Sequence, residues 1–224
     1  MIYLEQNIKG LCAKQGLHYN DFMADLEVDE AKELTLFDLE AIADEYQLDL
    51  MSLLFKPLFH AEHLAKKIKE IRFLILDVDG VMTDGGMYWT ESGDQFKKFN
   101  TKDGMGIMNL IKKGTPVGII SSGFTQHIVQ QRAALLGITH CHVGPQPKME
   151  ILKNWCTELH ISLAQVAIIG DDVNDLEIIQ NVGLAACPAD AVNEVKSNCA
   201  IILSHKGGEG CVREFIDGYL LKTN

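Results

Sequence analysis

The sequence IRFLILDVD, residues 71–79, is a short apolar run that ends in two acids, Asp77 and Asp79. In an extended segment, residues two apart point to the same side, so both carboxylates face one pocket. Two such carboxylates repel each other unless a cation neutralises them or one of them holds a proton. Gly80 then allows the chain to turn sharply away. The run predicts a buried strand with acidic chemistry at its carboxyl end, although an acidic strand end closed by a turn has the same pattern.

Outward from this run, apolar segments alternate with helical patterns. The further apolar segments are TPVGIIS (115–121), HCHVG (140–144), QVAIIGD (165–171), GLAA (183–186) and CAIIL (199–203), and the helical patterns cover residues 103–113, 125–136, 148–159, 173–182, 190–196 and 210–221. Such alternation predicts an α/β fold, a Rossmann-like parallel sheet with helices on both faces. In these sheets the functional groups collect at the carboxyl ends of the strands.

Residues 84–100, DGGMYWTESGDQFKKFN, interrupt this alternation. Two segments that carry aromatic residues flank Glu91-Ser92-Gly93-Asp94, a sequence typical of a turn. We expect a β-hairpin inserted after the first strand. An exposed aromatic hairpin needs a partner surface, which points to an oligomer.

Residues 1–60 differ from the rest of the chain in charge and periodicity. They hold twelve acidic residues and four lysines, which is about −8 of the formal net charge of −11. Leu36, Leu39 and Ile42 recur at helical spacing, and no strand-like run appears. We expect a small all-α domain at residues 1–60, a linker at 61–70 and the α/β domain at 71–224.

The bulk composition limits the classes of partner and compartment. The acidic excess argues against a large surface for nucleic acid or anionic membrane. The N-terminal residues MIYLEQNIKG lack the pattern of a signal peptide, and no apolar stretch approaches the ~20 residues that span a bilayer. The six cysteines form no CxxC pair, which is typical of reduced thiols. We therefore expect a cytoplasmic protein.

A second group of acids follows the apolar run at residues 165–169. Asp171, Asp172 and Asp175 lie within five residues there. Carboxylate oxygens from several acids suit Mg²⁺, and these acids should meet Asp77 at the same edge of the sheet. A single aspartate that caps the next helix would be the structural alternative, but it would not require three acids.

Two further elements supply groups for an anion. Ser121, Ser122 and Gly123 follow another predicted strand, where hydroxyl and backbone N–H groups can cradle a phosphate. Lys148, at the start of a predicted helix, would supply positive charge among the acids. Taken singly, these are also ordinary loop residues and a surface lysine.

In this order, the four elements resemble the haloacid dehalogenase superfamily of phosphatases over residues 71–220. The resemblance implies that Asp77 attacks phosphorus as a nucleophile and that Asp79 is the general acid and base. It also implies Mg²⁺ bound by Asp77, by the backbone carbonyl of Asp79 and by Asp171, with Asp172 and Asp175 supporting these ligands. Ser121 or Ser122, Gly123 and Lys148 would bind the phosphoryl group.

The chain has no room for a large cap domain between these motifs. The hairpin and the run KGGEGCVRE (206–214) resemble 3-deoxy-D-manno-octulosonate 8-phosphate phosphatases and their relatives that act on nonulosonate 9-phosphates. That resemblance implies a homotetramer in which a neighbour's C-terminal segment helps to close the active site. It also implies substrate contacts from Lys102, Asp103, Gly104 and Arg213.

One motif departs from that pattern. The third strand end reads Ser121-Ser122-Gly123-Phe124, whereas these families have Thr-Gly-Arg or Thr-Gly-Glu. The residue expected to meet the sugar has changed, so the sugar remains open. A phosphatase for another metabolite, such as a phospho-amino acid, and a regulator with a sensor phosphatase domain are the alternatives.

Residues 5–55 resemble a Cro/C1-type helix-turn-helix, mainly through residues 42–54 (IADEYQLDLMSLL). DNA binding needs cations against phosphates, and this segment has acids at residues 21–30 instead. We interpret it as a degenerate module that makes protein contacts and does not bind nucleic acid.

Overall fold

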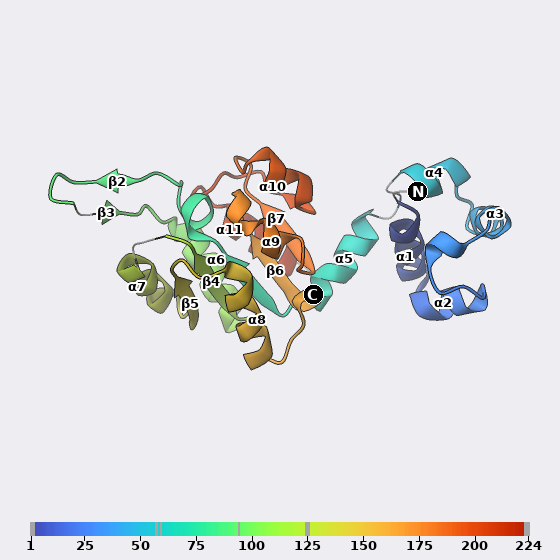
Figure 1. Cartoon of the computed structure of the whole chain (residues 1–224), viewed down its shortest axis with the longest axis horizontal. Coiled ribbons are helices and arrows are strands. Elements are labelled where there is room, and N and C mark those ends of the chain that lie inside the picture. Colours follow the sequence, from blue (N-terminus) through green and yellow to red (C-terminus); the bar gives the residue numbers. More distant parts are fainter. Residues whose placement is uncertain (1–2, 57, 59, 94, 124–125, 222–224) are drawn as a thin grey trace. The chain divides into compact units, whose positions relative to one another are not determined.

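The computed structural model describes residues 3–56, 58, 60–93, 95–123 and 126–221. The chain forms two compact units, Met1–Lys66 and Lys67–Asn224 (Figure 1). The helix α5 (His60–Glu70) covers both the boundary between them and the predicted linker. The domain limits that we predicted from the sequence stay a proposal.

The N-terminal unit is a bundle of short helices, as its periodicity predicts. It contains α1 (Leu4–Gln15), α2 (Tyr19–Asp25), the single turn η1 (Ala31–Glu33), α3 (Leu36–Glu45) and α4 (Leu50–Phe55). Its core includes Ile8, Leu11 and Leu53, all at most 1% exposed. The side-chain amide of the buried Asn7 donates hydrogen bonds to the carbonyl oxygens of Leu53 and Lys56, both at 2.7 Å. Asn7 of α1 thus provides hydrogen-bond donors for backbone carbonyl groups at the C-terminal end of α4.

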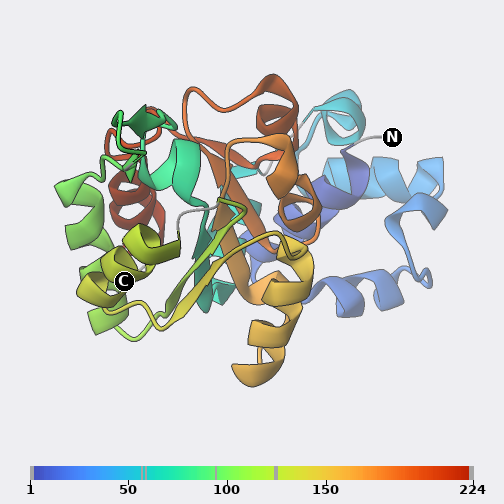
Figure 2. The same ribbon diagram turned by 60° about the vertical axis from the view of Figure 1, so that its left-hand side comes forward.

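The second unit is built on one parallel sheet of six strands in the order β5-β4-β1-β6-β7-β8. The strands are β1 (Phe73–Leu76), β4 (Val117–Ser121), β5 (His140–Val143), β6 (Val166–Ile169), β7 (Leu184–Cys187) and β8 (Ile201–Ile202). All four residues of β1 are buried, because helices cover the sheet on both faces (Figure 2). The predicted α/β fold is confirmed.

The helices of this unit are α6 (Thr101–Lys112), α7 (Gln126–Leu136), α8 (Lys148–Glu158), α9 (Leu176–Ile179), α10 (Asn193–Asn198) and α11 (Cys211–Phe215), with single turns η2 (Val78–Met82), η3 (Leu163–Gln165), η4 (Val173–Asp175) and η5 (Ile216–Leu220). Phe73 and Ile75 of β1 pack with Leu152 of α8 and Ile178 of α9 on one face. The intervening residues of β1 face the other side, where α6 contacts β4 and α11.

The predicted hairpin is present. Strands β2 (Tyr88–Trp89) and β3 (Gln95–Phe96) are antiparallel and extend away from the sheet (Figure 1). Trp89 is 56% exposed and Phe96 is 58% exposed. Asp94, the last residue of the predicted turn, lies outside the described residues.

Candidate active site

The turn after β1 brings the first acids into place. Asp77 directly follows the strand, and its N–H donates to the carbonyl oxygen of Ile169 at 3.1 Å. Gly80 has a φ of +91°, and a Cβ there would lie 2.0 Å from Oδ2 of Asp171. Glycine is therefore required at this position for two reasons: the backbone conformation has a positive φ, and the Asp171 carboxylate occupies the space of a Cβ.

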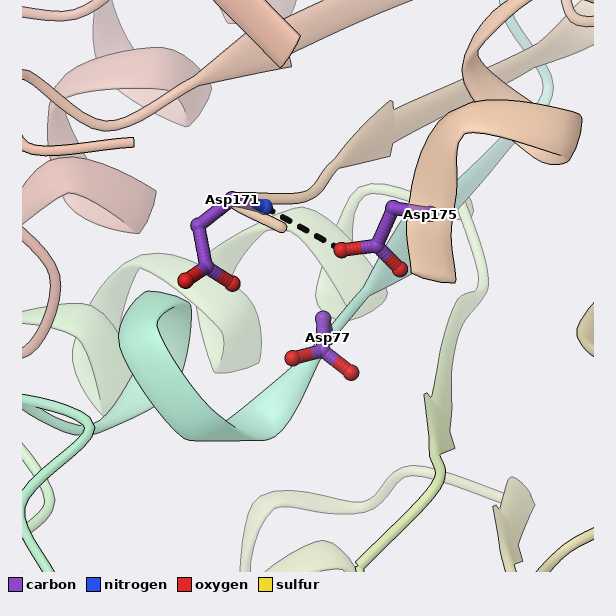
Figure 3. A group of neighbouring side chains, drawn as sticks. All are labelled: Asp77, Asp171 and Asp175. Carbon is purple, nitrogen blue, oxygen red and sulfur yellow. Dashed lines mark hydrogen bonds between the residues drawn. The ribbon is translucent and has the colours of Figure 1, made fainter. Parts of the chain in front are cut away.

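Three carboxylates from two strand ends converge beside this turn. Asp77, Asp171 and Asp175 each place an oxygen within 4.8 Å of the others (Figure 3). Asp175 is completely buried, and its Oδ2 accepts a hydrogen bond from the backbone N–H of Asp171 at 3.1 Å. The turn η4 directs Asp175 inward, towards the end of β1.

Lys148 lies among these acids. Its Nζ is 2.7 Å from Oδ1 of Asp77 and 2.7 Å from Oδ1 of Asp175. Burial lowers the pKa of Lys148, but the two carboxylates outweigh this effect and raise it, so the ammonium stays charged. One ammonium among three carboxylates leaves a surplus of negative charge if all three are ionised.

That surplus appears in the pKa values of the acids. Burial, and then the charge of Asp175, raise the pKa of Asp77 to about 7. Burial, and then the charge of Asp77, raise the pKa of Asp171 to about 8. Oδ1 of Asp171 is also buried without a hydrogen-bond partner among the described residues. A hard divalent cation fits such a set of oxygens, because it would neutralise the charge and coordinate the unpaired oxygen.

The remaining acid of this group is placed differently. Asp172 is exposed, and its Oδ1 accepts a hydrogen bond from the N–H of Val173 at 2.7 Å. It is thus the N-cap of η4. Asp171 and Asp175 thus lie close to Asp77, whereas the Asp172 carboxylate binds the backbone of the turn η4.

The two candidate serines differ in exposure. Ser121 is buried, and its Oγ accepts a hydrogen bond from the N–H of Gly123 at 3.1 Å, whereas Ser122 is exposed. A Cβ at Gly123 would lie 3.3 Å from Oδ2 of Asp79, so this loop borders the second acid of the DVD motif. Phe124 lies outside the described residues.

Asp79 has a partner that the sequence analysis missed. Nζ of Lys97, the residue after β3, forms an ion pair with Oδ1 of Asp79. Thr83 Oγ1 donates to the same oxygen at 3.4 Å. The DQFKKFN segment did contain two lysines in an acidic chain, but no local pattern indicates which carboxylate either would meet.

A family model for haloacid dehalogenase-like hydrolases matches residues 117–216. The 3-deoxy-D-manno-octulosonate 8-phosphate phosphatase KdsC of Yersinia pestis is 38% identical over 161 residues, which is 72% of this chain and 86% of that protein. The chain belongs to the haloacid dehalogenase-like hydrolases.

Solved structures of this hydrolase family show the same fold. A crystal structure of the Yersinia pestis phosphatase is 37% identical, with a TM-score of 0.69 over 72% of this chain and 86% of that one. The phosphatase of Moraxella catarrhalis, solved with magnesium, phosphate and KDO, is 30% identical, with a TM-score of 0.70 over 74% of this chain and 94% of that one. This haloacid dehalogenase-like hydrolase is a phosphatase, as the motifs predicted.

The residues predicted to contact the substrate have mainly structural partners in this hydrolase. Lys102 is exposed, but Asp103 is 2% exposed and its Oδ1 accepts the N–H of Arg213 at 2.8 Å. The side chain of Arg213 forms an ion pair with Asp217. A Cβ at Gly104 would lie 2.5 Å from the guanidinium of Arg132. Asp103 thus caps α11, and the roles of these residues in substrate binding stay predictions.

The glycine-rich loop before α11 is packed against the turn that carries Asp77. A Cβ at Gly207 would lie 1.9 Å from the carbonyl oxygen of Gly80. The N–H of Gly208 donates to the carbonyl oxygen of Val81 at 2.9 Å. Removal of residues 204–224, which would test for a C-terminal cover over the site, would also remove the buried core residue Phe215. Such a truncation would therefore disturb the fold as well as the site.

The helix-turn-helix resemblance of residues 5–55 remains a prediction. Over the described residues, the hydrolase has no helix that is both long and apolar enough to cross a membrane.

Proposed function

We propose that this phosphatase hydrolyses phosphomonoesters through an aspartyl-phosphate on Asp77. The observation that carries the proposal is the buried position of Asp77 beside the Lys148 ammonium and two further carboxylates. Lys148 screens the charge of Asp77 and fixes the orientation of its carboxylate, so an Oδ atom can attack phosphorus. Asp79 protonates the departing oxygen and later takes a proton from the water that hydrolyses the aspartyl-phosphate.

Asp77, Asp171 and the backbone carbonyl of Asp79 would hold Mg²⁺, which supplies charge neutralisation for the phosphoryl oxygens. Asp175 orients this group, since it binds both Lys148 and the backbone of Asp171. Ser121 or Ser122 would donate a hydrogen bond to the phosphate: the Oγ of Ser121 accepts the Gly123 N–H, which leaves its own O–H free to donate, and Ser122 is exposed.

We propose an acidic keto sugar phosphate as the substrate, either 3-deoxy-D-manno-octulosonate 8-phosphate or a nonulosonate 9-phosphate. The support is the 38% identity to KdsC of Yersinia pestis, of which this chain covers 86%. The Ser-Gly-Phe motif at residues 122–124 keeps a second candidate open, a phosphate ester of another small metabolite such as a phospho-amino acid. A cytoplasmic homotetramer, with protein contacts through the N-terminal module, completes the proposal.

A panel of phosphate esters assayed with Mg²⁺ tests this function. We expect the highest kcat/KM on the octulosonate and nonulosonate phosphates, and no turnover of any ester by Asp77→Asn. Glu177→Gln removes an exposed acid two residues after Asp175 and should retain wild-type turnover. Turnover by Asp77→Asn would refute the nucleophile, and preference for a phospho-amino acid would refute the substrate. A wild-type protein inactive on every ester would instead favour a sensor.

A further inference from the structure

Lys97 connects the hairpin to the reaction centre. It directly follows β3, and its Nζ reaches the carboxylate of Asp79. Its side chain is 13% exposed, whereas that of the next residue, Lys98, is 69% exposed and lies 3.6 Å from Asp84. Two adjacent lysines of one strand end thus have different partners, and only Lys97 contacts an acid of the DVD motif.

Asp79 is weakly held without this ion pair. Its side chain is 39% exposed, and its other hydrogen bond in the described part of the chain is the long one from Thr83 Oγ1 at 3.4 Å. A charge-assisted bond to a largely buried ammonium is shorter and stronger than a neutral one. Lys97 therefore selects one orientation of a carboxylate that would otherwise be free to rotate among its rotamers.

The ion pair borders a cavity of suitable size for the alcohol part of a phosphate ester. The cavity has a volume of about 390 Å³. It is lined by Asp79, Lys97 and Gly123 together with hairpin residues that include Tyr88, Trp89 and Phe96. Asp79 and Gly123 thus border the same pocket, most of whose wall is the hairpin. The leaving oxygen of an ester would lie in this pocket.

We propose that Lys97 is a positioning residue: its ammonium holds Oδ1 of Asp79, so that Oδ2, which carries the proton when Asp79 is the acid, faces the leaving-group oxygen of a substrate in this cavity. The inference rests on the proposed function, since it requires Asp79 to be the general acid. It makes the hairpin part of the catalytic apparatus, because the hairpin backbone determines where the ammonium of Lys97 lies.

The test compares two esters that differ in their need for a proton. An alkyl phosphate, 3-deoxy-D-manno-octulosonate 8-phosphate, releases a poor leaving group that must be protonated, whereas p-nitrophenyl phosphate releases a stable phenolate. We measure kcat/KM, which reports the steps up to departure of the leaving group, for wild type, Lys97→Met, Lys97→Arg and the control Lys98→Met. Thermal unfolding of each variant verifies that the fold is retained.

We expect Lys97→Met to lower kcat/KM for the alkyl ester about 10- to 100-fold and for the aryl ester by less than about three-fold, since general acid catalysis contributes to the first reaction only. Lys97→Arg should recover most of the loss, and Lys98→Met should match wild type on both esters.

Equal losses on both esters would overturn the proposal, because Lys97 would then act on the phosphate that both share. A loss confined to the KM of the alkyl ester would also overturn it, because Lys97 would then bind the sugar. Unchanged rates in Lys97→Met would also overturn it. Failure of the underlying function looks different: wild type itself would hydrolyse neither ester, or Asp77→Asn would hydrolyse both.

Discussion

The raised pKa values of Asp77 and Asp171 predict that Mg²⁺ stabilises the phosphatase far more at pH 8.5 than at pH 6. In the metal-free protein both pKa values lie above the ordinary value of 3.8, at about 7 and about 8. The folded protein therefore holds protons that the unfolded chain releases. These two groups lower the free energy of unfolding as the pH rises above about 4, and the loss is complete above about pH 8.

Mg²⁺ needs both carboxylates ionised, which determines the magnitude. At pH 6, Asp77 is one unit and Asp171 two units below their pKa values, so roughly one molecule in 10³ carries both charges. At pH 8.5 most molecules do. The apparent affinity of the protein for Mg²⁺ thus differs at most ~10³-fold between pH 6 and pH 8.5. At saturating Mg²⁺ this difference is equivalent to ~4 kcal/mol in the free energy of unfolding. For a unit of this size that is an upper limit of roughly 8–16 °C in Tm.

Thermal unfolding with and without saturating Mg²⁺ at the two pH values measures this effect. Both tryptophans, Trp89 and Trp155, lie in the α/β unit, so their fluorescence follows the unit that contains the site. Asp171→Asn should abolish the Mg²⁺ increment at both pH values, and the exposed control Glu177→Gln should retain it. An equal increment at pH 6 and pH 8.5, or a larger one at pH 6, would refute the assignment of these carboxylates as metal ligands.

Two further predictions concern the frame of the site. Gly80→Ala should lose roughly 2–4 kcal/mol of stability and most turnover, because its φ is +91° and its Cβ would meet the Asp171 carboxylate. Gly114→Ala, with a φ of +94° and nothing within 4 Å, should cost about 1 kcal/mol and leave kcat unchanged; similar kinetics in the two variants would contradict this explanation. Leu152→Ala removes a fully buried side chain from α8 and should lower the free energy of unfolding by about 2–5 kcal/mol. Urea unfolding followed by tryptophan fluorescence measures this loss, and a loss below about 1 kcal/mol would show that α8 packs loosely.

The sheet could be predicted because a strand buried on both faces must be apolar throughout. The strands β1 and β6 fulfil this condition, and β4 departs from it only at its last residue, Ser121. Each strand ends within a few residues of the predicted position. The predicted helix at 173–182 is shorter in the structure. Asp172 caps the turn η4 first, and α9 covers only Leu176–Ile179.

The acids at the strand ends could also be predicted, because the topology of a parallel sheet brings those ends to one edge. Their individual roles depend on finer geometry. Asp172 and Asp175 are equivalent in the sequence, yet the turn η4 leaves one exposed and directs the other to Lys148. Lys97 lies 18 residues from Asp79, and only the path of the hairpin brings the two together. The burial of Asp103 against α11 has no local signature in the sequence, and its contact with the substrate stays a prediction.

The order in which these parts leave the ribosome has a consequence for biosynthesis. Asp77 is made early, but its ammonium partner Lys148 is 71 residues further along the chain. Cys211, which donates to the carbonyl oxygen of Val81, is 130 residues beyond Val81. Contacts of such sequence separation form late and slowly. A nascent chain that has exposed Asp77 therefore has no assembled phosphatase site. Activity should appear only once translation has passed the glycine-rich loop, so a prematurely terminated product would be an inert one.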